Sequence, residues 1–339
     1  MGYRHLGFGI WGKPCYTSVV KVTVYQGENF ILTNEHVLRQ VAGEPDLTPV
    51  WVLVPDRFTL QAERQLLTQR GHLLNARVLT FSMLYRQVVA ELNRGEPLIP
   101  VLDKTSAVLY LWAAIKQVQD QLTWFKNSVE HYDFAEKMFN TLNQMRSSGV
   151  DFATLETQVK ATVSQQKYHD INLIYQAYQA QINGKTDSAG MLEYLLEHLT
   201  ESQVVRQTKI FVCGFESLSP ARLQVVDALC KLAPSVTIAA SQPELSQQLS
   251  KYPHYHIDTP VFAPERHTAC VLTERGEAHV VAEKIVHYLN QGVSPNHMVV
   301  LLTEFETVAP VWQVVFDEYH IPVNLDLGKK LSTMPEAKY

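Results

Sequence analysis

The stretch VWVLVPDRFTLQAER, residues 50–64, is the clearest indication of the fold, because an apolar run of strand length is followed directly by a polar turn and a helical pattern. The same arrangement returns about twenty residues later in ARVLTFSMLYRQVVAE, residues 76–91. Further strand patterns lie at 19–25, 209–214 and 235–240, and the first two are also followed by helical patterns. Strands that alternate with helices predict an α/β fold built on a parallel sheet.

Arginines are concentrated in these two strand–helix units. Between Val50 and Arg94 there are six arginines, no lysine and three acidic residues, a local balance of +3 (six minus three) in a chain of net charge −5. Arginines and aromatic side chains lie together at the carboxyl ends of these strands. Such a combination is typical of a surface that binds phosphates and on which bases stack. The alternative is an ordinary α/β sheet whose helices carry solvated charges, and charge alone favours this alternative.

The composition is that of a globular protein, with 46% apolar and 19% charged residues among 339, enough for two or three domains. The four cysteines lie far apart without a CxxC pair, and the thirteen histidines form no HExxH or HxxxH spacing, so neither set predicts a metal site. No apolar run approaches the ~18 residues that a membrane span needs. We therefore expect a soluble, cytoplasmic protein with no membrane association.

The period of the apolar residues divides the chain into segments. From Ser106 to Val129 apolar residues recur at steps of three and four, which predicts one long helix, and further helical patterns follow up to Leu199. In the last part of the chain, strand patterns at 269–272 and 298–302 alternate with helical ones. The predicted segments are a poorly specified lead-in (1–18), a first α/β domain (19–96 and 205–245), a helical insertion (97–204), a polar linker (246–266) and the start of a second α/β domain (267–339).

Four stretches, in this order, resemble one protein family: VLVPDRFTLQAERQLL (52–67), ARVLTFSMLYRQVV (76–89), KIFVCGFESLSPARLQVVDAL (209–229) and ERGEAHVVAEKIVHYLNQGVSPNHMVVLL (274–302). They are similar to the amino-terminal part of AddB/RexB, the B subunit of the bacterial ATP-dependent helicase–nuclease that processes DNA ends. The similarity runs from about Val19 to Pro335 and rests on the order and spacing of the stretches rather than on one motif.

The resemblance implies a RecA-like (P-loop NTPase-like) parallel-sheet domain with a helical insertion, followed by the start of a second, incomplete RecA-like domain, as in UvrD-type helicases. It implies single-stranded or double-stranded DNA ends as substrate, and the AddA/RexA helicase–nuclease subunit as partner in a heterodimer. The family uses ATP and Mg²⁺, and many members hold an iron–sulfur cluster in a carboxyl-terminal nuclease domain that this sequence lacks. We expect no cofactor in this chain and interpret it as a truncated or split gene product, or a fragment.

A phosphate-binding loop needs glycines whose backbone N–H groups converge, a lysine, and a hydroxyl for Mg²⁺. After the first strand the sequence reads QGENFILTNE (26–35), with Gly27, Thr33, two glutamates and no lysine. The acid expected after the strand at 209–212 is replaced by Cys213, and Glu216 lies three residues further on. We predict that these four residues mark a degenerate nucleotide site and that the chain has no catalytic residue.

In helicases of this fold, the turns after the second and third strands contact the phosphates of single-stranded DNA. The resemblance therefore places DNA contacts in the two turns, at Arg57, Phe58, Thr59, Phe81 and Ser82, and on the next helical turn, at Tyr85 and Arg86. Arginines and hydroxyls would hold phosphates, and a base stacked on Phe58 or Phe81 would add ~1–3 kcal/mol. The alternative for the two phenylalanines is a place in the core beneath the helices, and the sequence leaves both possibilities open.

Three hypotheses of function follow. The first is a non-catalytic, helicase-like part that binds DNA and assembles with AddA/RexA in double-strand-break repair by homologous recombination. The second is an active DNA-stimulated ATPase with an irregular nucleotide site. The third is a scaffold that binds only the partner subunit, or an inert relic of a broken gene.

Overall fold

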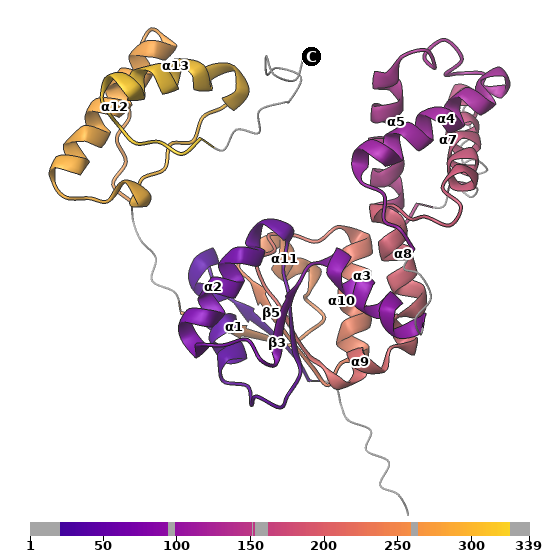
Figure 1. The fold of residues 1–339 in the computed structure, drawn as a ribbon, viewed down its shortest axis with the longest axis horizontal. Coiled ribbons are helices and arrows are strands. Elements are labelled where there is room, and N and C mark those ends of the chain that lie inside the picture. The colour runs from indigo at the N-terminus through magenta and orange to yellow at the C-terminus, as the bar shows by residue number, and fades with distance from the viewer. Residues whose placement is uncertain (1–20, 94–98, 151, 153–161, 259–263, 326–339) are drawn as a thin grey trace, which may run out of the picture. The chain divides into compact units, whose positions relative to one another are not determined.

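The computed structural model describes residues 21–93, 99–150, 152, 162–258 and 264–325, and Figure 1 shows the arrangement of their helices and strands. The predicted lead-in at 1–18 and the last residues from 326 onward lie outside the described part of the chain. The chain divides into two compact units, the first up to Val261 and the second from Phe262 onward. Each unit is considered by itself.

The first unit is built on one parallel sheet of six strands. Its strands are β1 (Lys21–Gln26), β2 (Val50–Leu53), β3 (Ala76–Leu79), β4 (Lys209–Val212), β5 (Ser235–Ala240) and β6 (His254–His256). They lie in the order β3-β2-β4-β5-β1-β6, and every pair is parallel. The sheet confirms the α/β, RecA-like fold class, with β1 to β3 and β4 to β5 inside the two ranges predicted for the first domain.

Helices cover both faces of this sheet, which explains why its strands read as continuous apolar runs. Val50 and Val52 of β2 point into the core beneath one layer of helices, while Trp51 and Leu53 point into the core on the opposite face. The first layer consists of α1 (Phe30–Ala42) and α2 (Thr59–Arg70), and the short turn η1 (Asp56–Phe58) precedes α2. The second layer, on the opposite face, consists of α3 (Phe81–Leu92), α8 (Ser188–His198), α9 (Gln203–Gln207) and α10 (Pro220–Leu232) (Figure 1).

The helical insertion forms its own core from α4 (Lys104–Val118), α5 (Tyr132–Ser147) and α7 (Thr162–Gln181). The single long helix predicted from Ser106 to Val129 is wrong, because α4 ends at Val118 and is followed by the turn η2 (Gln119–Gln121). The buried carboxylate of Asp170 accepts the backbone N–H groups of Thr123 (3.1 Å), Trp124 (2.8 Å) and Phe125 (2.9 Å). These bonds satisfy amides that a continuing helix would have used, and so they stabilise the turn.

A buried ion-pair network joins the insertion to the sheet. The guanidinium of Arg146 on α5 donates to Asp187 (2.7 Å), which precedes α8, and to Glu193 on α8 (2.7 Å). Tyr178 of α7 also donates to Asp187 (2.9 Å). Because α8 packs against α3 and α10, the last helix of the predicted insertion is part of the layer that covers the sheet.

The range predicted as a linker, 246–266, contains regular structure. Helix α11 (Pro243–Gln248) begins just before it, and β6 lies inside it as the edge strand beside β1. Two backbone hydrogen bonds join β1 to the segment around β6. The N–H of Val24 donates to the carbonyl of Pro253 (3.0 Å), and the N–H of Ile257 donates to the carbonyl of Gln26 (2.7 Å). The first domain therefore extends further along the chain than the composition suggested.

The described part of the second unit contains α12 (Glu274–Asn290), the turn η4 (Pro295–His297) and α13 (Phe305–Glu318). The helices were predicted, but the segments 269–272 and 298–302 form no β ladder among residues 264–325. A strand is defined by its hydrogen-bonded neighbour, and no neighbour lies in this range. Burial along 298–302 still has the two-residue period of a strand, since Val299 (80% exposed) and Leu301 (91%) alternate with residues packed on the helices.

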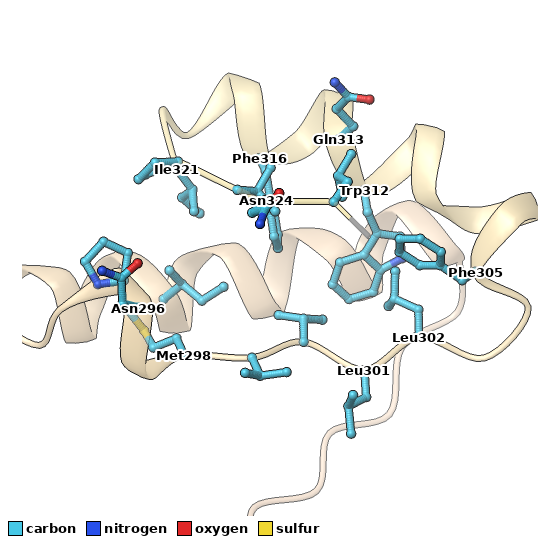
Figure 2. A pocket seen from close by; sticks show the side chains of 17 residues that line it. Asn296, Met298, Leu301, Leu302, Phe305, Trp312, Gln313, Phe316, Ile321 and Asn324 are labelled. Atoms are coloured by element: carbon cyan, nitrogen blue, oxygen red, sulfur yellow. The ribbon is translucent and has the colours of Figure 1, made fainter. Parts of the chain in front are cut away.

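A groove of about 680 Å³ lies between the segment 298–302 and α13. Figure 2 shows Trp312 and Phe316 of α13 among its lining residues, together with Met298 and Leu302. The described residues that line it include no charged side chain, so its chemistry does not suit a phosphate. The charged candidate residues all lie in the first unit.

Candidate nucleic-acid interface

All loops that follow the strands of the first unit lie at one edge of the sheet, because the strands are parallel. In open α/β sheets this carboxyl edge is where ligands bind. The strand order places the loops after β3, β2 and β4 next to one another, and the loop after β1 beyond them. Gly27 and Thr33 of the predicted nucleotide site therefore lie apart from the predicted DNA contacts, while Cys213 and Glu216 follow β4, directly beside the loop after β2.

The connection from β1 to α1 consists of only Gly27, Glu28 and Asn29. A phosphate-binding loop places about eight residues around the phosphates between its strand and its helix. Here the side chain of Asn29 accepts the N–H of Leu32 (3.0 Å) and so caps the start of α1 itself. The buried hydroxyl of Thr33 donates to the carbonyl of Asn29 (2.7 Å), which directs it into the helix instead of toward a metal ion.

The turn after β4 packs closely against α1 and against the loop after β2. Gly214 donates its N–H to the side-chain oxygen of buried Asn34 (2.6 Å), whose amide group in turn donates to Phe30 (2.7 Å). Gly214 has φ of +78°, and a Cβ built on it would lie 2.7 Å from the ring of Phe58. Backbone and side chains thus fill the space beside α1 in which a phosphate-binding loop would need room.

The residues expected to replace the magnesium-binding acid point in different directions. Cys213 is fully buried, and burial raises the pKa of its thiol, so that it remains protonated. Glu216 is exposed, and its carboxylate forms an ion pair with Arg57 (2.9 Å). Gly27, Thr33, Cys213 and Glu216 therefore do not converge on one point.

The predicted DNA contacts divide into exposed polar residues and buried rings. Arg57 and Arg86 are exposed, and Thr59 and Ser82 are half-buried at the starts of α2 and α3. The hydroxyl of Thr59 donates to the carbonyl of Asp56 (2.9 Å), and that of Ser82 shares a hydrogen bond with Thr80 (2.8 Å). Arg57, Thr59 and Ser82 lie in the turn or the first helical turn after two adjacent strands, so the structure brings them to one stretch of the edge, whereas Arg86 lies in the second turn of α3.

The three aromatic side chains of the prediction lie in the core. Phe58, Phe81 and Tyr85 are 6%, 7% and 1% exposed, and each packs edge-on or tilted against another ring: Phe30, Phe215 and Tyr194 respectively. A base cannot stack on a ring whose faces are covered, so the stacking role suggested for Phe58 and Phe81 is corrected to a packing role. The sequence held a signal for this, because Phe81, Leu84, Tyr85 and Val88 follow the spacing of an inner helical stripe.

Two residues of this edge were missed from the sequence. Arg222, in the first turn of α10, lies over the ring of Phe81, with 5.4 Å between its guanidinium carbon and the ring centroid. The amide of Gln248 binds both the N–H (3.1 Å) and the carbonyl (2.9 Å) of Leu218, which fixes the turn between β4 and α10. Pro220 marks the start of α10 at this edge, and this signal could have drawn attention to Arg222.

The fold and the edge together define a RecA-like domain with a helical insertion after its third strand. A family model described as "ADDB, N-terminal" matches residues 30–298, and the chain belongs to this family. It is also similar to the protein of Heliobacterium modesticaldum that is named as the B subunit of ATP-dependent helicase/deoxyribonuclease, with 26% identity over 75% of this chain and 21% of the relative.

Proteins of the same name in other bacteria give comparable matches. Identity is 21% for Alkaliphilus metalliredigens, over 91% of this chain and 32% of the relative, and 27% for Listeria welshimeri, over 59% and 18%. The chain thus spans about a fifth to a third of the length of these relatives. Among the described residues, none of the helices is long and apolar enough to cross a bilayer, and no group of three or more histidines, cysteines and carboxylates could hold a metal ion.

Proposed function

We propose that the loops after β2 and β3 bind the phosphate backbone of single-stranded DNA and that the chain does so without hydrolysing ATP. The observation that carries the proposal is a pair of exposed arginines that follow two adjacent strands, Arg57 in the turn η1 after β2 and Arg86 in the second turn of α3 after β3. Thr59 and Ser82 lie in the first turns of α2 and α3, where their hydroxyls form hydrogen bonds with Asp56 and Thr80. Guanidinium and hydroxyl donors are the groups that commonly hold phosphates, and such contacts position a strand irrespective of its sequence.

The part of the edge beside α1 supports the non-catalytic half of this proposal. Asn29, Thr33 and Asn34 use their polar atoms for bonds within the protein, and the β1–α1 connection is too short to surround a triphosphate. Neither Cys213 nor Glu216 is placed to hold Mg²⁺ there. Binding of a nucleotide would require this packed region to open.

The names of the relatives support a place for this activity in a larger assembly. We infer that the chain serves as the helicase-like part of the B subunit of a helicase–deoxyribonuclease, acting on DNA ends in the bacterial cytoplasm. A second protein of the AddA/RexA type would supply the ATP-driven motor. The role of the whole would be double-strand-break repair by homologous recombination.

The test measures fluorescence anisotropy of a labelled oligothymidine with the full chain, at several salt concentrations. Arg57→Ala and Arg86→Ala should each weaken binding by about fivefold, as for partly screened surface charges. Each should also reduce the slope of log K against log salt by about 0.7, the value for one phosphate contact on a single strand. ATP turnover should stay at background level with and without the oligonucleotide.

The matched control is the double substitution Arg39→Ala and Arg206→Ala, which removes the same charge from the opposite edge of the sheet. Arg39 lies in the last turn of α1, and Arg206 lies in α9, directly before β4. Equal affinities of the wild-type chain and the Arg57→Ala, Arg86→Ala double variant would refute the DNA-binding surface. Turnover of ATP that the oligonucleotide stimulates would refute the non-catalytic role.

A further inference from the structure

The turn after β4 brings a third arginine to the edge that carries Arg57 and Arg86. Arg222 lies in the first turn of α10 and is exposed. Among the described residues it forms no ion pair, whereas Arg57 is paired with Glu216. Because β4 neighbours β2 in the sheet, and neighbouring strands lie about 4.8 Å apart, the loops after β3, β2 and β4 are adjacent at this edge.

Arg222 packs on the first of two buried aromatic rings that contact each other, Phe81 and Phe215. Its guanidinium lies over Phe81, and Phe81 in turn packs edge-on against Phe215, with 5.8 Å between the ring centroids. Phe81 begins α3 after β3, while Phe215 and Arg222 follow β4, so the stack joins two loops of the edge. A contact with a ring face uses none of the five N–H donors of the guanidinium, which remain available for an anion.

The backbone that carries Arg222 is also held in place. Gln248 of α11 binds both polar backbone groups of Leu218, and Pro220 occupies the first turn of α10. Glu216, the acid on the same turn, has its carboxylate engaged with Arg57. A long side chain that is ordered before binding loses less conformational entropy when a ligand is bound.

We propose that Arg222 is a third phosphate-binding residue of this edge and that Phe81 positions its guanidinium. The inference rests on the proposed function, which it extends to the loop after β4. It gives the buried ring of Phe81 a role in DNA binding that differs from stacking on a base. The ligand is a phosphate of the nucleic-acid backbone, and the same surface would hold it whatever the base sequence.

The experiment measures binding of labelled oligothymidine to the full chain carrying Arg222→Ala, Arg222→Lys or Phe81→Leu, with Arg206→Ala as the control. Arg222→Ala should weaken binding about fivefold and lower the salt slope by about 0.7. Arg222→Lys should keep the salt slope, because the charge remains, and lose part of the affinity, because an ammonium lacks the forked donors.

Phe81→Leu separates positioning from simple packing through a double-mutant cycle. It should weaken binding in the wild-type background and change nothing further in the Arg222→Ala background, since its effect acts through Arg222. Circular dichroism of each variant confirms that the chain is folded. A ring that serves only the core would give the same fold-change in both backgrounds, which would overturn the positioning role.

Two outcomes distinguish this inference from the function on which it rests. If Arg222→Ala binds as tightly as the wild type while Arg57→Ala and Arg86→Ala bind more weakly, the third contact is wrong and the proposed function stands. If the wild-type chain does not bind the oligonucleotide, both are overturned.

Discussion

The carboxyl edge of the first sheet has two halves of opposite character. In the half around β1 and α1, Asn29, Thr33 and Asn34 bond to the protein itself, and Gly214 packs against the ring of Phe58. In the half around β2 and β3, Arg57 and Arg86 are exposed, while the rings of Phe58 and Phe81 are buried. The two halves meet at the loops after β2 and β4, where Phe58 and Gly214 pack together while Arg57 is exposed, so one fold seals the place of a nucleotide and leaves the adjacent surface open.

The largest expected effect is on the sealed half, from Gly214→Ala. The left-handed backbone at φ of +78° disfavours alanine, and the new Cβ would lie 2.7 Å from the ring of Phe58. Strain and overpacking together should lower the free energy of unfolding by about 2–4 kcal/mol. Gly71→Ala is the matched control, because Gly71 has φ of +81° and open space around it, so only the strain of about 1 kcal/mol applies. If urea unfolding gave equal losses of unfolding free energy for Gly214→Ala and Gly71→Ala, Gly214 would not be tightly packed against Phe58.

A smaller loss of stability is expected from Asn34→Ala, which removes the acceptor of the Gly214 N–H. The buried amide would be left without a partner, a change that costs about 1–3 kcal/mol. Urea unfolding measures it, with Gln69→Ala on the exposed face of α2 as a control that should change stability by less than about 0.5 kcal/mol. An unchanged free energy of unfolding for Asn34→Ala would indicate that water replaces the hydrogen bond to the Gly214 N–H. The region beside α1 would then be more accessible to water than its contacts suggest.

The smallest effect concerns the boundary between the halves, where Glu216 pairs with Arg57. Both side chains are exposed, so their ion pair is screened by solvent and contributes less than about 1 kcal/mol. Glu216→Gln should release Arg57 and tighten binding of oligothymidine by about twofold to threefold at low salt. Glu197→Gln, on α8, makes the same change of charge away from the edge. Weaker binding by Glu216→Gln would mean that the carboxylate orients Arg57 rather than competing with the phosphate.

Much of the first unit could be predicted from the sequence, since its central strands are buried on both faces and appear as short apolar runs. The strand at β6 could not, because its three residues, His254 to His256, are polar or aromatic and gain their structure by pairing with β1 at the other end of the unit. The break after Val118 has a similar cause. It depends on the carboxylate of Asp170, which no local periodicity reveals.

For the candidate residues, the sequence could predict which side chains are exposed only in part. Arg57 and Arg86 are exposed as expected, since charged side chains after a strand rarely become buried. Aromatic residues are ambiguous at such positions, because a ring can serve a ligand or the core equally well, and Phe58 and Phe81 lie in the core. Arg222 was missed because its importance arises from a contact with Phe81, a residue far away in the sequence.

The edge strand β6 has a practical consequence for work on the isolated first unit. A recombinant fragment that ended at the boundary suggested by composition, near residue 245, would remove β6 and leave β1 with a free row of N–H and carbonyl groups. Exposed strand edges of this kind recruit other chains, and self-association would then compete with every binding measurement. Extending the fragment to Asp258 keeps that row occupied by its native neighbour.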